Sequence, residues 1–438
     1  MLDLQGRRIL PLLILAAARG QAERDPGEVL ERARANLQSM TRRLAKYACI
    51  ETVNRIYYEA PRDLSAPLSC VRIEAARARR ATPLAVEATD RLRLEVTVSE
   101  GHEIHAWPGA TRFDIRDVDE IIHQGPIGTG SFGTHLIGVF DNPSVDFQYV
   151  GEKSDGGHTV LEYRYRVSAD ASRYRVKTGN TWKIVPYEGT FWLDPDSLEL
   201  RRFTVEAAAM PPGSFMCELN SALDYQQVHI GDGDVLLPRE GQLGIVMDTG
   251  HETSNLTTFS NCREYQAESA LRFDTGSDAE DAATKLAVRE PLPLPIGLPV
   301  ELALMDPIDT GMAAAGDPVS AKVVKPVHRP GSSDILIPAG AIVRGRITRL
   351  EHHLLPRPYF LVSISFNRLV RGEISSPFAA KYDASEKLAK DLDADLHLPG
   401  RGLEFWDVGT FLIPSGKPSY VFPAGYESKW ETLATPSR

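Results

Sequence analysis

The first long hydrophobic pattern in the chain predicts an amphipathic helix over residues 25–44. Asp25 supplies an N-cap, Pro26 suits the first helical position and Glu28 completes a capping box. The apolar residues recur at helical spacing, at Leu30, Ala33, Leu37, Met40 and Leu44. Arginines occupy several of the other positions, so one face of the helix is apolar and needs a surface to cover it.

Alternation of apolar and polar residues then predicts half-buried antiparallel strands. Within residues 91–98, leucines and valines at even positions alternate with charged residues and threonine at odd positions. The predicted strands cover residues 47–58, 91–98, 161–167, 191–193, 198–205, 216–229, 234–247 and 255–273. Residues 194–197, Asp-Pro-Asp-Ser, predict a hairpin turn. The predicted fold is mainly β (α+β), a curved antiparallel half-barrel with a long N-terminal helix.

The pattern breaks between Asp274 and Pro299, where an acidic, apolar-poor stretch is followed by four closely spaced prolines. We therefore expect a helix-and-sheet domain at 23–275, a linker at 276–295 and a smaller C-terminal β-barrel domain at 296–430. The clearest strand of the second domain is predicted at 341–350. Two further helices are predicted, a short apolar one at 132–140 and a charged surface helix at 379–392.

Residues 1–22 have the pattern of a secretory signal peptide. Arg7 and Arg8 precede an apolar run of about ten residues, against the roughly 20 needed to span a bilayer. Small residues follow, and a short buried helix is the alternative. We expect cleavage near Ala22, a periplasmic location and no transmembrane segment in the mature chain.

Composition indicates a folded protein, with 42% hydrophobic, 25% charged and 8% aromatic residues. The chain carries 49 basic and 59 acidic residues, a net charge of −10. Loss of residues 1–22 would make the balance still more acidic. A surface of this charge repels nucleic acid, so no nucleic-acid partner is expected.

The cysteines are Cys49, Cys70, Cys217 and Cys262, an even number in a chain that we expect to enter an oxidising compartment. They predict disulfides, for which three pairings are open. Nearness in sequence favours Cys49 with Cys70 and Cys217 with Cys262. No C-x-x-C pair is present, which argues against a zinc site.

No catalytic constellation, metal site or cofactor site is predicted. Residues 128–133 spell G-x-G-x-x-G, which is similar to the nucleotide-covering loop of protein kinases, but the H-R-D and D-F-G strings are missing downstream. The interpretation favoured is a flexible turn that enters the short helix. His102 and His105 would point to opposite faces of a regular strand. The G-x-S-x-G and H-E-x-x-H signatures of hydrolases are absent from the sequence.

Aromatic residues crowd the strand-rich domain and are candidates for lining an apolar cavity. The candidate ligand-binding residues are Trp107, Phe132, Trp182, Phe191 and Trp192. The alternative is that these side chains simply pack the helix against the sheet.

A resemblance strengthens the cavity hypothesis. Residues 189–203, Gly-Thr-Phe-Trp-Leu-Asp-Pro-Asp-Ser-Leu-Glu-Leu-Arg-Arg-Phe, with the leader and the helix, look like the periplasmic lipoprotein-carrier (outer-membrane lipoprotein-sorting, LolA-like) family. The resemblance covers roughly residues 25–273. It implies a sheet curled around a helix, which encloses a pocket for acyl chains.

Residues 296–372 carry a second resemblance. Residues 297–304, 316–321 and 335–341, with the string Ile-Pro-Ala-Gly at 337–340, look like the β-barrel domain of TrbI-type conjugation proteins. That resemblance implies a small barrel and an envelope setting.

The leading hypothesis is a non-enzymatic periplasmic protein that binds a lipid, acyl chain or other apolar small molecule in its first domain. Envelope proteins are further candidate partners. The alternative is an envelope scaffold that binds other proteins and whose apparent pocket is filled core. An open pocket lined by aromatic residues would favour the first hypothesis, and a closed interior would favour the second.

Overall fold

The computed structural model describes residues 25–61, 68–265, 294–383 and 408–434, apart from residues 111, 115, 123, 124, 208, 232 and 373. Antiparallel β-structure dominates, with 53% of the described residues in strands and 12% in helices, which confirms the predicted fold class. The predicted signal peptide at 1–22 lies outside the described residues, as do residues 276–293 of the predicted linker.

Helix α1 (Pro26–Leu44) forms as its sequence predicts. The Asp25 carboxylate accepts a hydrogen bond from the Gly27 N–H at 3.0 Å and so caps the first turn. Its buried residues are Val29, Ala33, Leu37, Thr41 and Leu44. The apolar face packs into a cluster of side chains from the sheet, which is the cover that the amphipathic pattern requires.

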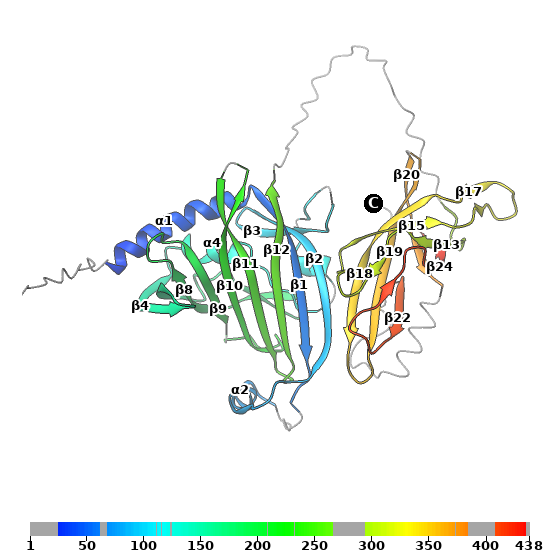
Figure 1. The fold of residues 1–438 in the computed structure, drawn as a ribbon. Helices are drawn as coiled ribbons and strands as arrows, with labels where there is room; N and C mark the ends of the chain where they lie inside the picture. The colour runs from blue at the N-terminus through cyan, green and yellow to red at the C-terminus, as the bar shows by residue number, and fades with distance from the viewer. Residues whose placement is uncertain are drawn as a thin grey trace, which may run out of the picture.

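Antiparallel strands form one curved sheet beside α1 (Figure 1), in the order β4, β5, β8, β9, β10, β11, β12, β1, β2 and β3. Their bounds are β1 (Tyr47–Tyr58), β2 (Val86–Ser99), β3 (His102–Ala106), β4 (Asp146–Asp155), β5 (His158–Val167), β8 (Tyr187–Leu193), β9 (Leu200–Ala207), β10 (Met216–Ile230), β11 (Gly233–Met247) and β12 (Glu252–Glu264). Every pairing is antiparallel, and alternate side chains therefore face the interior.

Smaller elements cover the inner side or the edges of this sheet. They are α3 (Val118–Ile121), α4 (Thr134–Phe140) and the hairpin of β6 (Arg175–Thr178) and β7 (Thr181–Ile184). Helix α4 confirms the short apolar helix predicted at 132–140. The hairpin and β4 were missed, because their residues lack a sustained apolar alternation.

Helix α2 (Cys70–Arg79) is arginine-rich and was not predicted from the sequence. Ile73 is buried beneath it, and Cys70 ties its first turn to Cys217 in β10. Arg77 forms ion pairs with Glu218 and Glu252 of the sheet. The helix has no wide apolar face. The buried Ile73 side chain, the disulfide and these ion pairs hold it against the sheet instead.

A second group of strands surrounds its own hydrophobic cluster. Its elements are β13 (Pro299–Leu304), β14 (Ile308–Asp309), β15 (Pro318–Val323), β16 (Val327–His328), β17 (Ile335–Ile337), β18 (Ile342–His353), β19 (Tyr359–Arg371), β20 (Ile374–Pro377), β21 (Ala380–Tyr382), β22 (Thr410–Pro414), β23 (Val421–Phe422) and β24 (Glu427–Thr432).

The second group does not form the fully closed barrel that we expected. β13 pairs with β15 and β24, β15 with β18, and β18 with β19. β19 pairs with β20 and β21 with β24, so the chain changes its pairing partner at Phe378 and Ala379. The Phe378 N–H still donates to the Asn367 carbonyl at 3.0 Å, and the Ala379 carbonyl accepts from the Leu433 N–H at 2.8 Å. The helix predicted at 379–392 is wrong at its start, because residues 380–382 are β21; residues 384–392 lie outside the described residues.

The two groups of strands meet edge to edge. Residues 351–353 of β18 pair with residues 88–90 of β2, and Leu92 bridges to Ala315. One sheet therefore continues from the first group into the second. The domain limits of 23–275 and 296–430 stay a prediction.

Disulfides link Cys49 with Cys262 and Cys70 with Cys217, and no free cysteine remains in the described part of the chain. The pairing favoured by nearness in sequence is therefore wrong. β1 lies against β12, although their residues are about two hundred positions apart, and this pairing places Cys49 beside Cys262.

Candidate functional site

The predicted ligand-binding residues do not lie together. Phe132 and Phe191 are buried, with 1% and 0% of their surface exposed. Trp192 follows Phe191 in β8 and therefore points to the opposite face of the sheet. Trp182 and Trp107 each line a cavity, but two different ones.

An aromatic core fills the end of the sheet that α1 covers. The Phe191 ring lies 5.2 Å from that of Tyr163 and 5.1 Å from that of Phe140, centroid to centroid. Tyr165 stacks on Phe203 at 5.1 Å. The described rings pack on one another here, so Phe191 belongs to the ordinary core that we weighed as the alternative to a cavity.

Beside this core, a cavity of about 360 Å³ opens on the inner side of the sheet. We call it the hairpin cavity, because the β6–β7 hairpin lies over it. Leu219 of β10 and Leu243 and Ile245 of β11 form its floor. Other apolar residues in its walls are Val118, Ile122, Ile127, Ile137, Val176, Trp182 and Met216. Leu243, Ile127, Ile137 and Met216 are only half-buried, so the fold leaves apolar surface uncovered.

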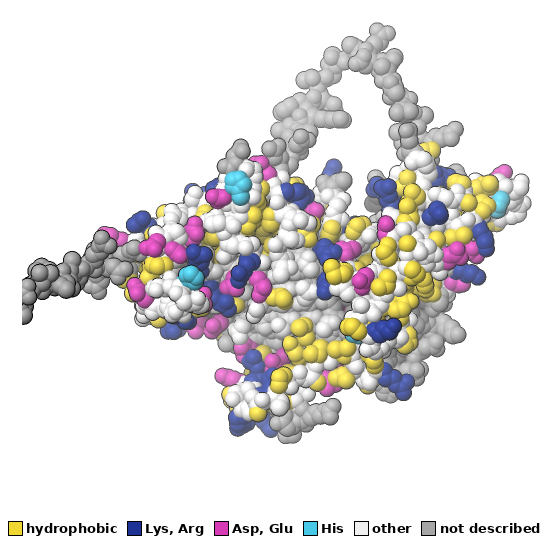
Figure 2. Space-filling model, in the orientation of Figure 1, with side chains coloured by type: hydrophobic (Ala, Val, Ile, Leu, Met, Phe, Trp, Pro, Cys, Tyr) yellow, Lys and Arg dark blue, Asp and Glu magenta, His cyan; other side chains and the backbone are white. Residues whose placement is uncertain are grey.

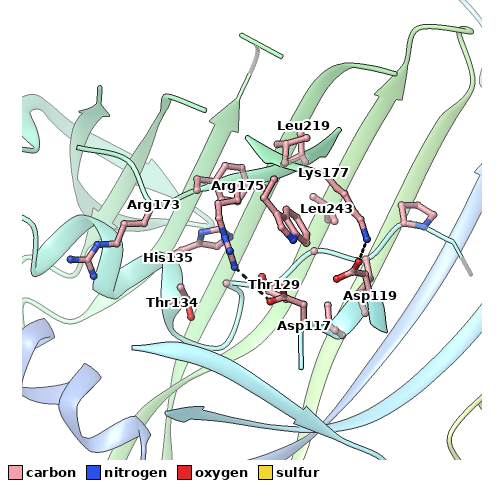
Figure 3. A pocket seen from close by; sticks show the side chains of 18 of the residues that line it. Asp117, Asp119, Thr129, Thr134, His135, Arg173, Arg175, Lys177, Leu219 and Leu243 are labelled. Atoms are coloured by element: carbon pink, nitrogen blue, oxygen red, sulfur yellow. Dashed lines mark hydrogen bonds and ion pairs between the residues drawn. The ribbon is translucent and has the colours of Figure 1, made fainter. Parts of the chain in front are cut away.

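Two ion pairs hold the hairpin against the segment around α3 (Figure 3). Arg175 Nη2 lies 3.6 Å from Asp117 Oδ1, and Lys177 Nζ pairs with Asp119. Trp182, on the other strand of the hairpin, lies under both cations, with its ring centroid 5.2 Å from Arg175 Cζ. The sequence analysis did not predict these ion pairs. The only signal was the matched spacing of two acids at 117 and 119 and two bases at 175 and 177.

The glycine-rich loop at 128–133 forms part of the cavity wall, and its backbone donors are already occupied. The Glu103 carboxylate of β3 accepts hydrogen bonds from the N–H groups of residues 130, 132, 133 and 134, at 2.6–3.3 Å. Gly130 has φ +114°, and a Cβ there would lie 2.4 Å from the His135 ring. The loop is an anion-binding nest filled by the chain's own carboxylate, which accounts for the motif without a nucleotide.

His135 of α4 stands in the cavity wall and is 5% exposed. Burial lowers the pKa of His135 to about 4, so the imidazole is neutral at neutral pH. Its ring lies 5.4 Å from that of Tyr174. A neutral, buried imidazole adds no charge to the cavity wall.

We expect the His135 imidazole to titrate near pH 4 in an NMR experiment. An unfolded chain binds that proton at about pH 6.5, so this group stabilises the fold above pH 6.5 and the stability is lost as the pH falls toward 4. The loss is on the order of 3 kcal/mol. His135→Gln should remove this part of the pH dependence, and His102→Gln, on an exposed residue, should not. A His135 midpoint near 6.5 would contradict the placement.

Figure 2 shows acidic and basic side chains interspersed over the face that it draws, with no field of one sign. Among the described residues, no group of three or more histidine, cysteine, aspartate or glutamate side chains is placed to hold a metal ion. None of the described helices is both long enough and apolar enough to cross a bilayer.

Comparison with known proteins finds no matching family model and no matching curated protein. Solved structures do match, each over 55% of this chain and 94% of its own length. An outer membrane lipoprotein-sorting protein domain from Vibrio parahaemolyticus is 13% identical, with a TM-score of 0.27. A LolA superfamily protein from Nitrosomonas europaea is 9% identical (TM-score 0.26), and a DUF1329 family protein from Desulfovibrio piger is 11% identical (TM-score 0.28). The resemblance of residues 296–372 to TrbI-type domains stays a prediction.

The hairpin cavity therefore combines an apolar floor with charged groups at its mouth, where Arg175 and Lys177 pair with acidic side chains and Arg173 is exposed. Burial keeps the His135 imidazole neutral. The Glu103 carboxylate already accepts hydrogen bonds from the backbone N–H groups of the glycine-rich loop. This arrangement offers apolar contact to a ligand. The described residues around it do not assemble a nucleophile, a base and an oxyanion donor.

Proposed function

We propose that the protein binds an apolar ligand, a lipid or an acyl chain, in the hairpin cavity, and that it works in the periplasm. The observation that carries this proposal is the uncovered apolar floor beside a completed aromatic core. Leu243, Ile127 and Ile137 remain half-buried, although the neighbouring Phe191 and Phe203 are wholly enclosed. Burying such surface against a ligand is favourable by about 25 cal/mol per Å².

The size of the cavity supports the same proposal. At about 360 Å³, it falls toward the lower end of the roughly 300–1,000 Å³ typical of small-molecule sites. A single chain or a small apolar molecule fits this volume better than a complete phospholipid with two long chains.

The ion pairs at the mouth of the cavity are exposed to water. The Arg175–Asp117 pair is nearly half exposed on both partners, and Lys177 is similarly exposed. Ion pairs this exposed are screened by water and contribute little to stability. These pairs therefore add little to the closure of the mouth, and the hairpin stays anchored by Val176, which is buried in the main hydrophobic cluster.

Binding of BODIPY-labelled dodecanoic acid to the full chain tests the proposal. We expect saturable binding with micromolar or tighter affinity. Leu243→Trp places a larger side chain in the floor of the cavity and should weaken binding by at least about tenfold, the equivalent of 1.4 kcal/mol. Fluorescence polarisation measures both values.

Gln242→Trp is the matched control, because Gln242 precedes Leu243 in β11 and is exposed on the opposite face of the sheet. It should bind the probe within about twofold of the wild type. Absence of saturable binding by the folded wild type would overturn the carrier proposal in favour of the scaffold. Equal binding by the two tryptophan variants would place the ligand elsewhere.

A further inference from the structure

A second cavity, of about 260 Å³, lies where the two groups of strands meet. We call it the junction cavity. Asp90 and Leu92 of β2 line one side, and Arg346 and Leu350 of β18 line the other. Trp107, which follows β3, also contributes to its wall. The lining is rich in charge, unlike that of the hairpin cavity.

Two of its arginines are neutralised by carboxylates. Arg55 Nε lies 2.6 Å from Asp90 Oδ1, and both side chains are about 5% exposed. Arg349 donates to both oxygens of Glu351, at 2.6 and 2.9 Å. Burial alone would raise the pKa of the Glu351 carboxyl, but hydrogen bonds from its neighbours, together with the Arg349 charge, hold that pKa well below its usual range. In each of these two pairs the positive and the negative charge compensate each other.

Arg346 has no such partner. Its guanidinium lies 5.2 Å from the centroid of the Trp107 ring, and no carboxylate of the described residues forms an ion pair with it. Its Nη1 is buried and donates no hydrogen bond within that part of the chain. Burial lowers the pKa of Arg346, which reflects the cost of holding this charge away from water.

Arg91, which also lines the junction cavity, adds a second positive charge without a carboxylate partner among the described residues. Its guanidinium donates to the amide oxygen of Asn54 and the backbone carbonyl of Gly311, both at 2.7 Å, and both acceptors are neutral. The cavity lining thus carries four arginines and two carboxylates. A positive excess that is partly withdrawn from water is costly unless an anion compensates it.

We propose that the junction cavity binds a small organic anion, with a carboxylate or phosphate group on Arg346. The planar guanidinium suits either group, because its parallel N–H donors match two oxygens. Leu92, Leu350 and the Trp107 face offer contact to a short apolar body. This site goes beyond the proposed acyl-chain function, because the hairpin cavity shares only Ile122 with it.

The ligand would also join the two groups of strands, because its contacts come from both. Arg346 and Leu350 belong to β18, whereas Leu92 and Trp107 belong to the first group. A molecule that binds only this assembled junction stabilises it by mass action. Thermal unfolding should therefore shift upward in the presence of the anion.

Isothermal titration of the full chain with hexanoate, inorganic phosphate and hexanol tests the site. We expect hexanoate or phosphate to bind saturably, more weakly as salt is added, and neutral hexanol not to bind there. Arg346→Gln should weaken anion binding at least tenfold. Arg344→Gln, on an exposed residue of the same strand outside the cavity, should leave it within twofold.

A wild-type measurement covers the case in which Arg346→Gln fails to fold. The indole N–H signal of Trp107 in NMR spectra should shift saturably with the bound anion and should not shift with hexanol. Absence of saturable binding by both anions, or undiminished binding by folded Arg346→Gln, would overturn the proposal.

Competition separates the two sources of such an anion. If the head group of the acyl ligand occupies the junction cavity, saturating BODIPY-dodecanoate should weaken hexanoate binding. If a free acid or phosphate is the ligand, the two should bind independently. Leu243→Trp should weaken dodecanoate binding and leave hexanoate binding unchanged, so failure of the acyl-chain proposal is distinguished from failure of this one.

Discussion

Replacing Phe191 by alanine should lower the free energy of unfolding by about 3–5 kcal/mol. Its side chain is wholly buried, and its ring contacts those of Tyr163, Phe140 and Phe147 at centroid distances of 5.2, 5.1 and 6.0 Å. Removing the ring leaves a void that the interlocked neighbours cannot fill without moving. Urea denaturation, followed by circular dichroism, measures the loss.

Trp192→Ala is the matched control. The indole lies on the other face of β8, where Lys153 Nζ is 4.4 Å and Arg202 Cζ 5.4 Å from its ring. Such contacts contribute about 0.5–1 kcal/mol each at exposed sites, so the expected loss is about 1–2 kcal/mol. Equal losses for the two variants would contradict the assignment of the two faces.

Removal of the Cys49–Cys262 disulfide should cost about 5 kcal/mol, by the chain-entropy account for a loop of this length. The two cysteines are 213 positions apart, so the link removes much of the freedom of the unfolded chain. Denaturant unfolding of Cys49→Ala/Cys262→Ala, beside the wild type, measures the change.

The companion variant Cys70→Ala/Cys217→Ala removes the disulfide that closes a loop of 147 positions. It should lose a similar amount of stability, because the entropy depends on loop length only logarithmically. Non-reducing peptide mapping is the direct check of the pairing. A peptide that joins Cys49 to Cys70 would contradict the structure.

The sequence was sufficient for the elements with a sustained pattern. The capped helix α1 and the long strands β1, β2, β10 and β11 follow from helical spacing and alternation, because burial of one face imposes a period. The β6–β7 hairpin was not predictable in this way. β7 is exposed along its whole length, so no apolar period marks it.

The pairing of strands that are far apart in the sequence could not be predicted either. Nothing local reveals that β12 lies beside β1, and the disulfide partners depend on that neighbourhood. The same is true of the candidate sites. Glu103 fills a nest built by residues about thirty positions away, and the junction cavity requires β2 beside β18. The aromatic pattern indicated an apolar interior, but only the fold separates core rings such as Phe191 from Trp182 in a cavity wall.

Native mass spectrometry shows directly whether the hairpin cavity holds an apolar ligand. The protein would be purified without detergent from the cells that naturally produce it. We expect a bound lipid or acyl species that adds its mass to the folded wild type and is lost from Leu243→Trp but retained by Gln242→Trp. A wild-type mass equal to the polypeptide with two disulfides, unchanged after incubation with fatty acid, would contradict this expectation.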